Sequence, residues 1–287
     1  MRSSSIVIRR EVAAVALAAG AGRRLLPLTA TLPKPLCPVG GVPLVDLTID
    51  RLRPLVGAVA VNVHHGREAL EPHLRARSDV HVAVEPDVAL GTAGAIAALR
   101  DWIGGRAVVV VNADGWSPDP MPDLTAGWDG ERVRVLVAGD DRLRDDSLVA
   151  GCLLPWTVVA ALDRRPCGLF EAVWRDARDR GRLDVVRHDG AFVDCGTPAR
   201  YLAANLRAAA LAGGSIIAAD AEVEDGVRVE RSVIGRGARI RDDVVDSVVW
   251  DGQSVEVGAS IVRSIRIGPS TTVSVDDPRP PRTVARN

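Results

Sequence analysis

The residues best suited to chemistry lie in a glycine-rich stretch near the N-terminus. Its sequence is Leu17-Ala-Ala19-Gly20-Ala-Gly22-Arg-Arg24, and it is followed by Pro33-Lys34-Pro35-Leu36. A strand that ends in small residues and two glycines lets backbone N–H groups approach a phosphate chain closely. Arg24 and Lys34 add positive charge to the same stretch, so the pattern predicts a polyphosphate site rather than a merely flexible turn.

Two better-known phosphate motifs are excluded. The P-loop pattern GxxxxGK[ST] is absent, and the dinucleotide fingerprint needs a third glycine where this chain has Leu25. Of the 36 basic residues, Lys34 is the single lysine. Because an ammonium is a compact point charge and a guanidinium is a planar fork, the two bind phosphate oxygens differently. The one retained lysine therefore indicates a role for Lys34.

The composition is that of a globular chain with a sizeable core. The chain has 287 residues, of which 47% are hydrophobic and 25% charged, with a net charge of −1. This balance gives no electrostatic argument for nucleic acid or an acidic membrane surface as a partner. Four scattered cysteines predict reduced thiols and a cytoplasmic location. Arg9-Arg10 before Val12–Ala19 superficially resembles a signal peptide, but Glu11 interrupts it and no leader is expected.

Alternating strands and helices predict an α/β domain. The expected strands are Val12–Leu17, Val59–Val63, Val80–Val84 and Ala107–Val111, and the expected helices are Pro43–Leu55, Arg67–Leu74 and Ala93–Trp102. Strands that are apolar on both faces and separated by helices favour a parallel sheet covered on both sides. Ligands of such sheets bind at the carboxyl ends of the strands. Residues 113–150 look less regular, and a second αβ stretch runs from 151 to about 212.

From Ser215 to Val275 the helical periodicity disappears. Val or Ile recurs every few residues, and Ser-Val or Ser-Ile steps at 232, 247 and 264 are 15 and 17 residues apart. This spacing is close to three hexapeptides per coil and predicts a short parallel β-helix, with an antiparallel sheet as the alternative. The expected domains are 1–212, a hexapeptide-repeat β-helix over 213–275, and a disordered tail over 276–287.

These motifs together resemble the sugar-1-phosphate nucleotidylyltransferases, and most of all the mannose-1-phosphate guanylyltransferases, which carry LAAGxGxRLxPLTxxxPKPL. Three more segments fall in family order, namely Glu85–Gly94 as base-recognition segment, Val111–Asp114 as metal-binding strand end and Phe192–Pro198 as second metal-binding turn. The resemblance implies a Rossmann-like, mixed but mainly parallel α/β sheet followed by a left-handed parallel β-helix.

The resemblance also implies roles for individual residues. Arg24, Lys34 and Asp114 are the expected catalytic residues, and Asp114 and Asp194 the expected Mg2+ ligands. The expected nucleotide contacts are Leu17, Ala19, Gly20, Gly22, Gly91 and Thr92, and the expected substrate contacts are Gly151, Gly196 and Thr197. The sugar phosphate would attack the α-phosphorus of a nucleoside triphosphate and release pyrophosphate, without a covalent enzyme intermediate. GTP and mannose 1-phosphate are favoured as substrates; neither nucleic acid nor membrane is expected as a partner, and self-association is left open.

Some positions depart from the family pattern. Arg23 stands where a small residue is usual, Phe192 replaces a usual Trp, and Ala113 a common Gly. The Glu-Lys-Pro element is missing, and Val149 occupies the place of a sugar-contacting Asn. Two alternatives therefore stay open, a non-catalytic regulatory subunit that binds nucleotide sugars, and a uridylyl- or cytidylyl-transferring relative.

Two further functions are disfavoured. Hexapeptide acyltransferases typically use a His base, and all five histidines lie at or before His188, outside the repeats. His64-His65 could suggest a metal site, but adjacent residues at a strand end are expected to point in opposite directions.

Overall fold

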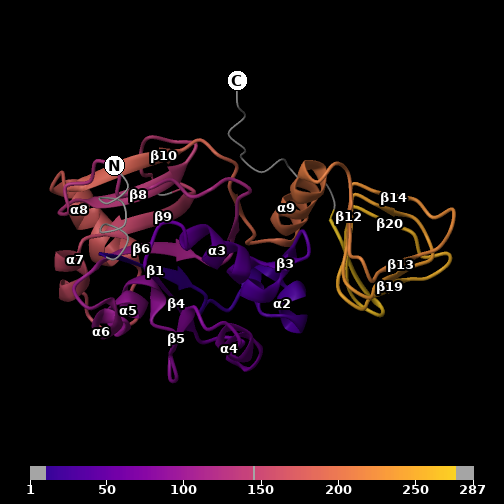
Figure 1. The fold of residues 1–287 in the computed structure, drawn as a ribbon, viewed down its shortest axis with the longest axis horizontal. Coiled ribbons are helices and arrows are strands. Elements are labelled where there is room, and N and C mark those ends of the chain that lie inside the picture. The colour runs from indigo at the N-terminus through magenta and orange to yellow at the C-terminus, as the bar shows by residue number, and fades with distance from the viewer. Residues whose placement is uncertain (1–10, 145, 276–287) are drawn as a thin grey trace. The chain divides into compact units, whose positions relative to one another are not determined.

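The computed structural model describes residues 11–144 and 146–275. In its described parts the chain forms two compact units (Figure 1). The first unit comprises residues 11–21 and 45–192, and the second comprises residues 22–44 and 193–275. Residues 22–44 and 193–212 thus group with the C-terminal repeats, while the predicted domain boundary at 212 stays a prediction. The predicted disordered tail, 276–287, lies outside the described residues.

The first unit is built on a seven-stranded mixed sheet. Its strands are β1 Val12–Leu17, β4 Ala58–Val63, β5 Val80–Val84, β6 Ala107–Asn112, β8 Val133–Ala138, β9 Val149–Leu154 and β10 Leu183–His188, in the order β10-β8-β9-β6-β1-β4-β5. Strand β9 runs antiparallel to β6 and β8, and the other pairs are parallel. The four predicted strands are confirmed. Strand β8 lies inside the stretch that we expected to be less regular.

Helices connect and cover these strands. They are α3 Leu44–Leu52, α4 Arg67–Arg75, α5 Gly91–Ala98, α6 Arg100–Ile103, α7 Trp156–Ala161, the π-helix η3 Phe170–Trp174 and α8 Arg175–Asp179. The single helix predicted over Ala93–Trp102 is interrupted at Leu99, whose φ and ψ of −89° and 4° leave the helical region. Helix α3 ends earlier than predicted because Pro54 disfavours helical geometry just before it. Among the described residues, no helix is both long and apolar enough to cross a membrane.

Strand β1 lies inside the sheet, between β6 and β4, and its carboxyl end marks the edge at which the glycine loop begins. Leu17, the last residue of β1, is in register with Asn62 on β4 and with Asn112 on β6. A buried apolar cluster that includes Val15 and Ile96 packs α5 against this part of the sheet. After β1 the chain continues to β4 on one side of β1, and it later returns to β6 on the other side. The carboxyl end of β1 is therefore the switch point at which open α/β sheets bind ligands.

The second unit joins short N-terminal elements to a long helix and a coil of strands. The short elements are η1 Arg23–Leu25, α2 Leu28–Thr31, η2 Lys34–Leu36 and the hairpin of β2 Pro38–Val39 with β3 Val42–Pro43. Strand β11 Val193–Asp194 precedes α9 Pro198–Leu211. Pro198 occupies the first turn of α9, where its missing N–H needs no partner, and the Thr197 hydroxyl accepts a hydrogen bond from Arg200 N–H.

The repeats after α9 form a parallel β-helix. Three ladders of parallel strands run through it, β12-β15-β18-β21, β13-β16-β19 and β14-β17-β20. Their bounds are β12 Ile216–Ile217, β13 Glu222–Val223, β14 Val229–Glu230, β15 Val233–Ile234, β16 Arg239–Ile240, β17 Val244–Val245, β18 Val248–Val249, β19 Ser254–Val255, β20 Ile261–Val262, β21 Ser264–Gly268 and β22 Thr271–Ser274. The antiparallel alternative is wrong except for β22, which turns back along β21. The left-handed sense of the coil stays a prediction.

A ladder of serines explains the spacing of the repeats. The N–H groups of Ser247 and Ser264 donate to the hydroxyl oxygen of the serine one coil earlier, at 3.1 and 3.0 Å. Each hydroxyl in turn donates to a carbonyl two residues back in its own coil, as Ser247 does to Val245 at 2.7 Å. The side chain of Ser247 is fully buried, so the hydroxyl supplies a partner that water cannot.

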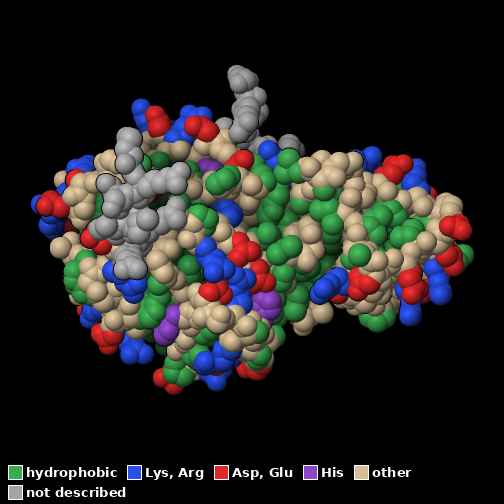
Figure 2. Space-filling model, in the orientation of Figure 1, with side chains coloured by type: hydrophobic (Ala, Val, Ile, Leu, Met, Phe, Trp, Pro, Cys, Tyr) green, Lys and Arg blue, Asp and Glu red, His purple; other side chains and the backbone are tan. Residues whose placement is uncertain are grey.

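Charged side chains cover the β-helix in pairs of opposite sign. Arg231 donates hydrogen bonds to both carboxylate oxygens of Asp246 in the next coil, and Arg241 donates to Glu256 at 3.1 Å. In the face that Figure 2 shows, acidic and basic side chains are interspersed and do not gather in a patch of one sign. Such exposed pairs contribute little stability singly, but they keep the coil surface polar.

We expect Ser247→Ala to destabilise the β-helix by about 1–3 kcal/mol, because it leaves the buried N–H of Ser264 without an acceptor. Urea unfolding measures the change. Ser260→Ala, at an exposed position, is the matched control and should unfold like the unchanged protein. Equal midpoints for the two variants would contradict the ladder.

Candidate active site

The glycine loop begins at the carboxyl end of β1, within the first unit. Ala18 N–H donates to the side-chain oxygen of Asn62 at 2.9 Å, which fixes the loop as it leaves the strand. Gly20 is exposed, and a Cβ atom built on it would meet no atom within 4 Å. The backbone at Gly20 is therefore accessible to a ligand, while the predicted nucleotide contacts of Leu17, Ala19 and Gly20 stay predictions.

Asp114 lies at the same edge of the sheet. The preceding residue, Ala113, donates its N–H to the carbonyl of Leu17 at 2.9 Å, so the turn after β6 is held against the start of the glycine loop. The following residue is Gly115, whose Cβ would lie 2.6 Å from the ring of Phe192. A side chain at 115 would displace that ring, so the glycine and the aromatic residue together determine the course of the chain next to Asp114.

A buried polar relay connects the glycine loop with the predicted base-recognition segment. Asn62 and Glu85 are each only 3% exposed. The amide nitrogen of Asn62 donates to Glu85 Oε1 at 2.7 Å, and the N–H of Leu90 donates to Glu85 Oε2 at 2.8 Å. The backbone N–H groups of Ala18 and Leu90, at the two ends of the relay, are both donors. They require the Asn62 oxygen to face Ala18 and both Glu85 oxygens to accept.

The two adjacent histidines differ from expectation. Their rings lie next to each other, with centroids 4.6 Å apart, because β4 ends at Val63 and the strand alternation stops there. His64 Nδ1 lies 2.6 Å from the carbonyl of Glu85, and His65 Nδ1 lies 2.9 Å from the carbonyl of Ala19. The prediction that they point in opposite directions is wrong. Both contact the backbone of the same two segments that the Asn62–Glu85 relay connects.

Three further predicted contacts are tightly packed in the first unit. The Thr92 hydroxyl accepts a hydrogen bond from the N–H of Leu169 at 2.7 Å, and a Cβ at Gly91 would lie 2.6 Å from the carbonyl of Cys167. A Cβ at Gly151 would lie 2.9 Å from the side chain of Met121. Packing thus requires glycine at 91 and is tight at 151, while the predicted ligand contacts of Gly91, Thr92 and Gly151 stay predictions.

The second unit brings Gly22 against Lys34. Gly22 has a φ of +62°, and a Cβ there would lie 2.9 Å from Thr29 Cγ2 and 3.1 Å from Lys34 Cβ. The Thr29 hydroxyl donates to the carbonyl of Gly22 at 3.1 Å. Both the backbone conformation and the close approach therefore require glycine at this position. Arg24, two residues later, is exposed.

Lys34 and Asp194 form a partly buried ion pair. Lys34 is 7% exposed, and its Nζ lies 3.6 Å from Asp194 Oδ1. Arg200 NH1 lies 3.0 Å from Asp194 Oδ2. A Cβ at Gly196 would lie 3.0 Å from both Asp194 oxygens and 3.3 Å from Arg24 NH2. A side chain at position 196 would crowd the Asp194 carboxylate, which in the second unit pairs with Lys34 and Arg200.

The described residues fit a hard divalent cation in chemical type. Carboxylate oxygens are the ligands that Mg2+ prefers, and it is usually bound by one or two carboxylates plus substrate phosphates. Within residues 11–144 and 146–275, no three His, Cys, Asp or Glu side chains cluster closely enough to hold a metal by themselves. Asp114 belongs to the first unit and Asp194 to the second, and their role as metal ligands stays a prediction.

Sequence reasoning missed Asn62, Glu85 as a buried residue, and Arg200. A polar amide inside the apolar strand Ala58–Val63 was the available signal for Asn62, because such a residue needs a buried partner. Arg200 follows the helix cap Thr197, and its contact with Asp194 depends on how the turn before α9 is folded.

We expect Glu85→Gln to destabilise the first unit by about 1–3 kcal/mol although the two side chains have nearly the same shape. The glutamine NH2 would face a donor, either Asn62 or Leu90, and flipping Asn62 would only move the conflict to Ala18. Urea unfolding checks the change. Asp87→Asn, an exposed change in the same segment, is the control, and equal stability of the two variants would contradict the relay.

Comparisons with known proteins show what the chain is similar to. The nucleotidyl transferase family model matches residues 13–131. The N-acetylmuramate alpha-1-phosphate uridylyltransferase of Caulobacter vibrioides is 32% identical over 233 residues, covering 68% of this chain and 96% of that protein. The mannose-1-phosphate guanylyltransferase regulatory subunit alpha of Xenopus tropicalis is 35% identical over 146 residues, covering 46% of this chain and 34% of that protein.

A solved structure shows the same fold. The UDP-glucose pyrophosphorylase from Acinetobacter baumanii superposes with a TM-score of 0.56 at 16% identity, covering 68% of this chain and 92% of that one. The near-complete match to the Caulobacter protein, together with the family model, decides the family. This chain belongs to the sugar-1-phosphate nucleotidyltransferases.

Proposed function

We propose that this chain transfers uridylyl from UTP to the 1-phosphate of an N-acetylated amino sugar, of the N-acetylmuramate type, and releases pyrophosphate. The observation that carries the proposal is the match to a uridylyltransferase of that substrate over 96% of its length. A relative of the same name from Neisseria meningitidis serogroup B is 41% identical over 108 residues. The missing Glu-Lys-Pro element instead favours a regulatory chain that binds a nucleotide sugar without turning it over.

GTP and mannose 1-phosphate are the second candidate pair. The pattern of residues 17–36 favours them, and relatives named for that reaction match 46% of this chain. Those relatives include regulatory subunits, so the same observation also supports a chain that binds a nucleotide sugar without turning it over. The choice among these depends on contacts to the base and sugar.

In the proposed reaction this chain's residues supply charge and position. Gly20 leaves open backbone for the phosphates, and Lys34 would neutralise charge that develops on the transferred phosphoryl group. Arg24, which lies near the Asp194 carboxylate at the Gly196 turn, would hold the leaving pyrophosphate. Mg2+, proposed to be held by Asp114 and Asp194, would neutralise phosphate charge when bound.

Pyrophosphate release tests the function directly. UTP, GTP, CTP, dTTP and ATP are each combined with a panel of sugar 1-phosphates that includes N-acetylmuramate, N-acetylglucosamine and mannose 1-phosphate. We expect turnover with UTP and an N-acetylated amino sugar. Turnover with GTP and mannose 1-phosphate would replace the proposed substrates, and tight binding of a nucleotide sugar without turnover would establish a regulatory protein.

Lys34→Ala should lower kcat by about 10²–10³, because it removes a preorganised charge from the transition state. Asp114→Asn should abolish turnover while the protein stays folded. Asp163→Asn, at a residue 74% exposed, serves as the charge-matched control and should retain full activity. Near-normal turnover of Lys34→Ala would refute the catalytic assignment of Lys34.

A further inference from the structure

The hairpin that follows Lys34 is clamped by helix α9. The carbonyl of Pro38 accepts hydrogen bonds from the hydroxyl of Tyr201 and from the amide nitrogen of Asn205, the latter at 3.4 Å. The N–H of Gly40, at the hairpin tip, donates to Asn205 Oδ1 at 3.0 Å. Tyr201 and Asn205 are both fully buried, so these bonds do not compete with water.

The β-helix supplies the third partner of this clamp. Trp250 Nε1 donates to the hydroxyl oxygen of Tyr201 at 2.9 Å, and the two rings meet edge to face. Because indole is only a donor, the Tyr201 oxygen must accept from it, and the hydroxyl hydrogen must point to Pro38. Burial raises the pKa of Tyr201 well above its ordinary value, so the hydroxyl keeps this hydrogen.

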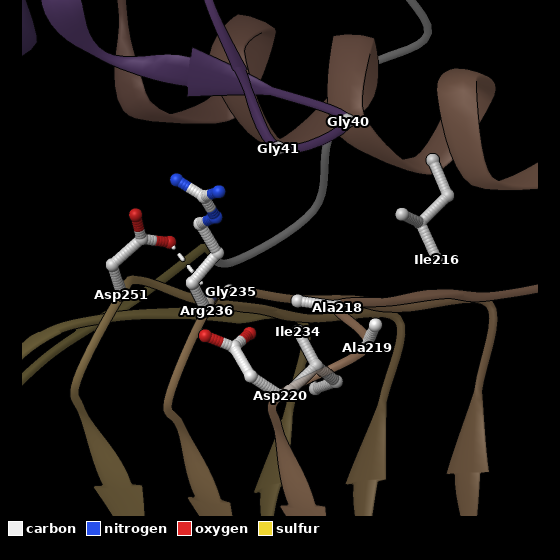
Figure 3. Close-up of a pocket in the computed structure, with 10 residues that line it drawn as sticks. All are labelled: Gly40, Gly41, Ile216, Ala218, Ala219, Asp220, Ile234, Gly235, Arg236 and Asp251. Atoms are coloured by element: carbon white, nitrogen blue, oxygen red, sulfur yellow. Dashed lines mark hydrogen bonds between the residues drawn. The ribbon is translucent and has the colours of Figure 1, made fainter.

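Neighbouring side chains pack against the hairpin tip on one side, and the other side faces a pocket. A Cβ at Gly40 would lie 3.3 Å from Ile216 of β12 and 3.4 Å from Ala208 of α9. Beside the tip is an open pocket of about 540 Å3, lined by the Gly40–Gly41 turn and by coil residues that include Arg236. Figure 3 shows the Arg236 side chain extending toward this turn across the pocket. With one flank open, the hydrogen bonds to Pro38 and Gly40 are what fix the hairpin.

The backbone connects this clamp to Lys34 over a few residues. Cys37, the residue before Pro38, donates its N–H to the carbonyl of Lys34 at 3.1 Å and accepts a hydrogen bond from Leu44 at 3.2 Å. Helix α9 starts four residues after Asp194, whose carboxylate pairs with the Lys34 ammonium. Helix α9 thus holds the Lys34 segment through the hairpin and through the ion pair.

We propose that Trp250 and Tyr201 are positioning residues through which the β-helix fixes the place of the Lys34 ammonium. The catalytic consequence rests on the proposed function, whereas the positioning itself does not. Shifts of about 1 Å at a reacting group can lower a rate by about 10². A repeat domain that sets the position of one lysine therefore contributes to the reaction without contacting substrate.

The single lysine makes the position of Lys34 directly observable. Full-length protein labelled with 13C at the lysine ε-carbon gives one lysine resonance that needs no assignment. We expect Tyr201→Phe to shift this resonance, because the ring stays and the bridging hydroxyl is lost. Trp250→Phe should shift it less. In the double variant, Trp250→Phe should add nothing, because both changes act through the same hydroxyl.

Kinetics give a second readout on the same variants. Tyr201→Phe should lower kcat about tenfold and leave the KM for the nucleoside triphosphate within about twofold. Val255→Ala is the control, since Val255 is fully buried in the β-helix core, on a ladder separate from the strands that contact α9. It should lower the thermal stability of the β-helix but change neither the Lys34 resonance nor kcat.

The outcomes separate the two proposals. An unchanged Lys34 resonance in Tyr201→Phe and Trp250→Phe overturns the positioning role, and a shift in Tyr201→Phe alone overturns the part of the β-helix in it. A shift equal to that of Val255→Ala also overturns it, as general destabilisation. Shifted resonances in a protein that turns over no substrate pair would uphold the positioning and refute the proposed function.

Discussion

A buried ammonium group needs an anionic partner, and Asp194 supplies one for Lys34. Much of the second unit follows from bringing these two residues together. Gly22 lets the chain pass within contact of Lys34, and Gly196 leaves room for the Asp194 carboxylate. Arg200 adds a second cation from the first turn of α9. Within the second unit, the ion pair therefore relates the Gly22 turn, the Lys34 segment and α9 to one another.

In the first unit, buried hydrogen bonds hold the loops at the edge of the sheet. Parallel pairing aligns the ends of β1, β4 and β6, and the loops that leave them are then joined by buried hydrogen bonds. In the Asn62–Glu85 relay, the hydrogen-bond partners leave each group one permitted donor or acceptor role. Relays of this kind tolerate few substitutions, since a single reversed polarity leaves a buried group unpaired.

The β-helix is stabilised by repetition, because each coil offers its serine oxygen and its apolar residues to the next. Strands β15 and β21 of the coil also contact α9, and Trp250 binds Tyr201, which holds the hairpin after Lys34. About a third of this chain has no counterpart in the Caulobacter relative. The clamp that Tyr201, Asn205 and Trp250 form on the hairpin gives one physical reason for this chain to carry a repeat domain.

The sequence by itself determined the strands β1, β4, β5 and β6, the coil repeat and the family, because these depend on local patterns of apolar residues, glycines and charges. It did not determine β8, whose short alternation lies among turn residues, or the break at Leu99. Which residues meet was decided only by the tertiary structure. Asn62 on β4 binds Glu85, which directly follows the neighbouring strand β5. Trp250 binds Tyr201, which lies 49 residues away in the sequence. The rings of His64 and His65 meet because strand β4 ends just before them. Contacts between distant segments depend on how the elements pack, and a residue's sequence neighbours carry little information about that packing.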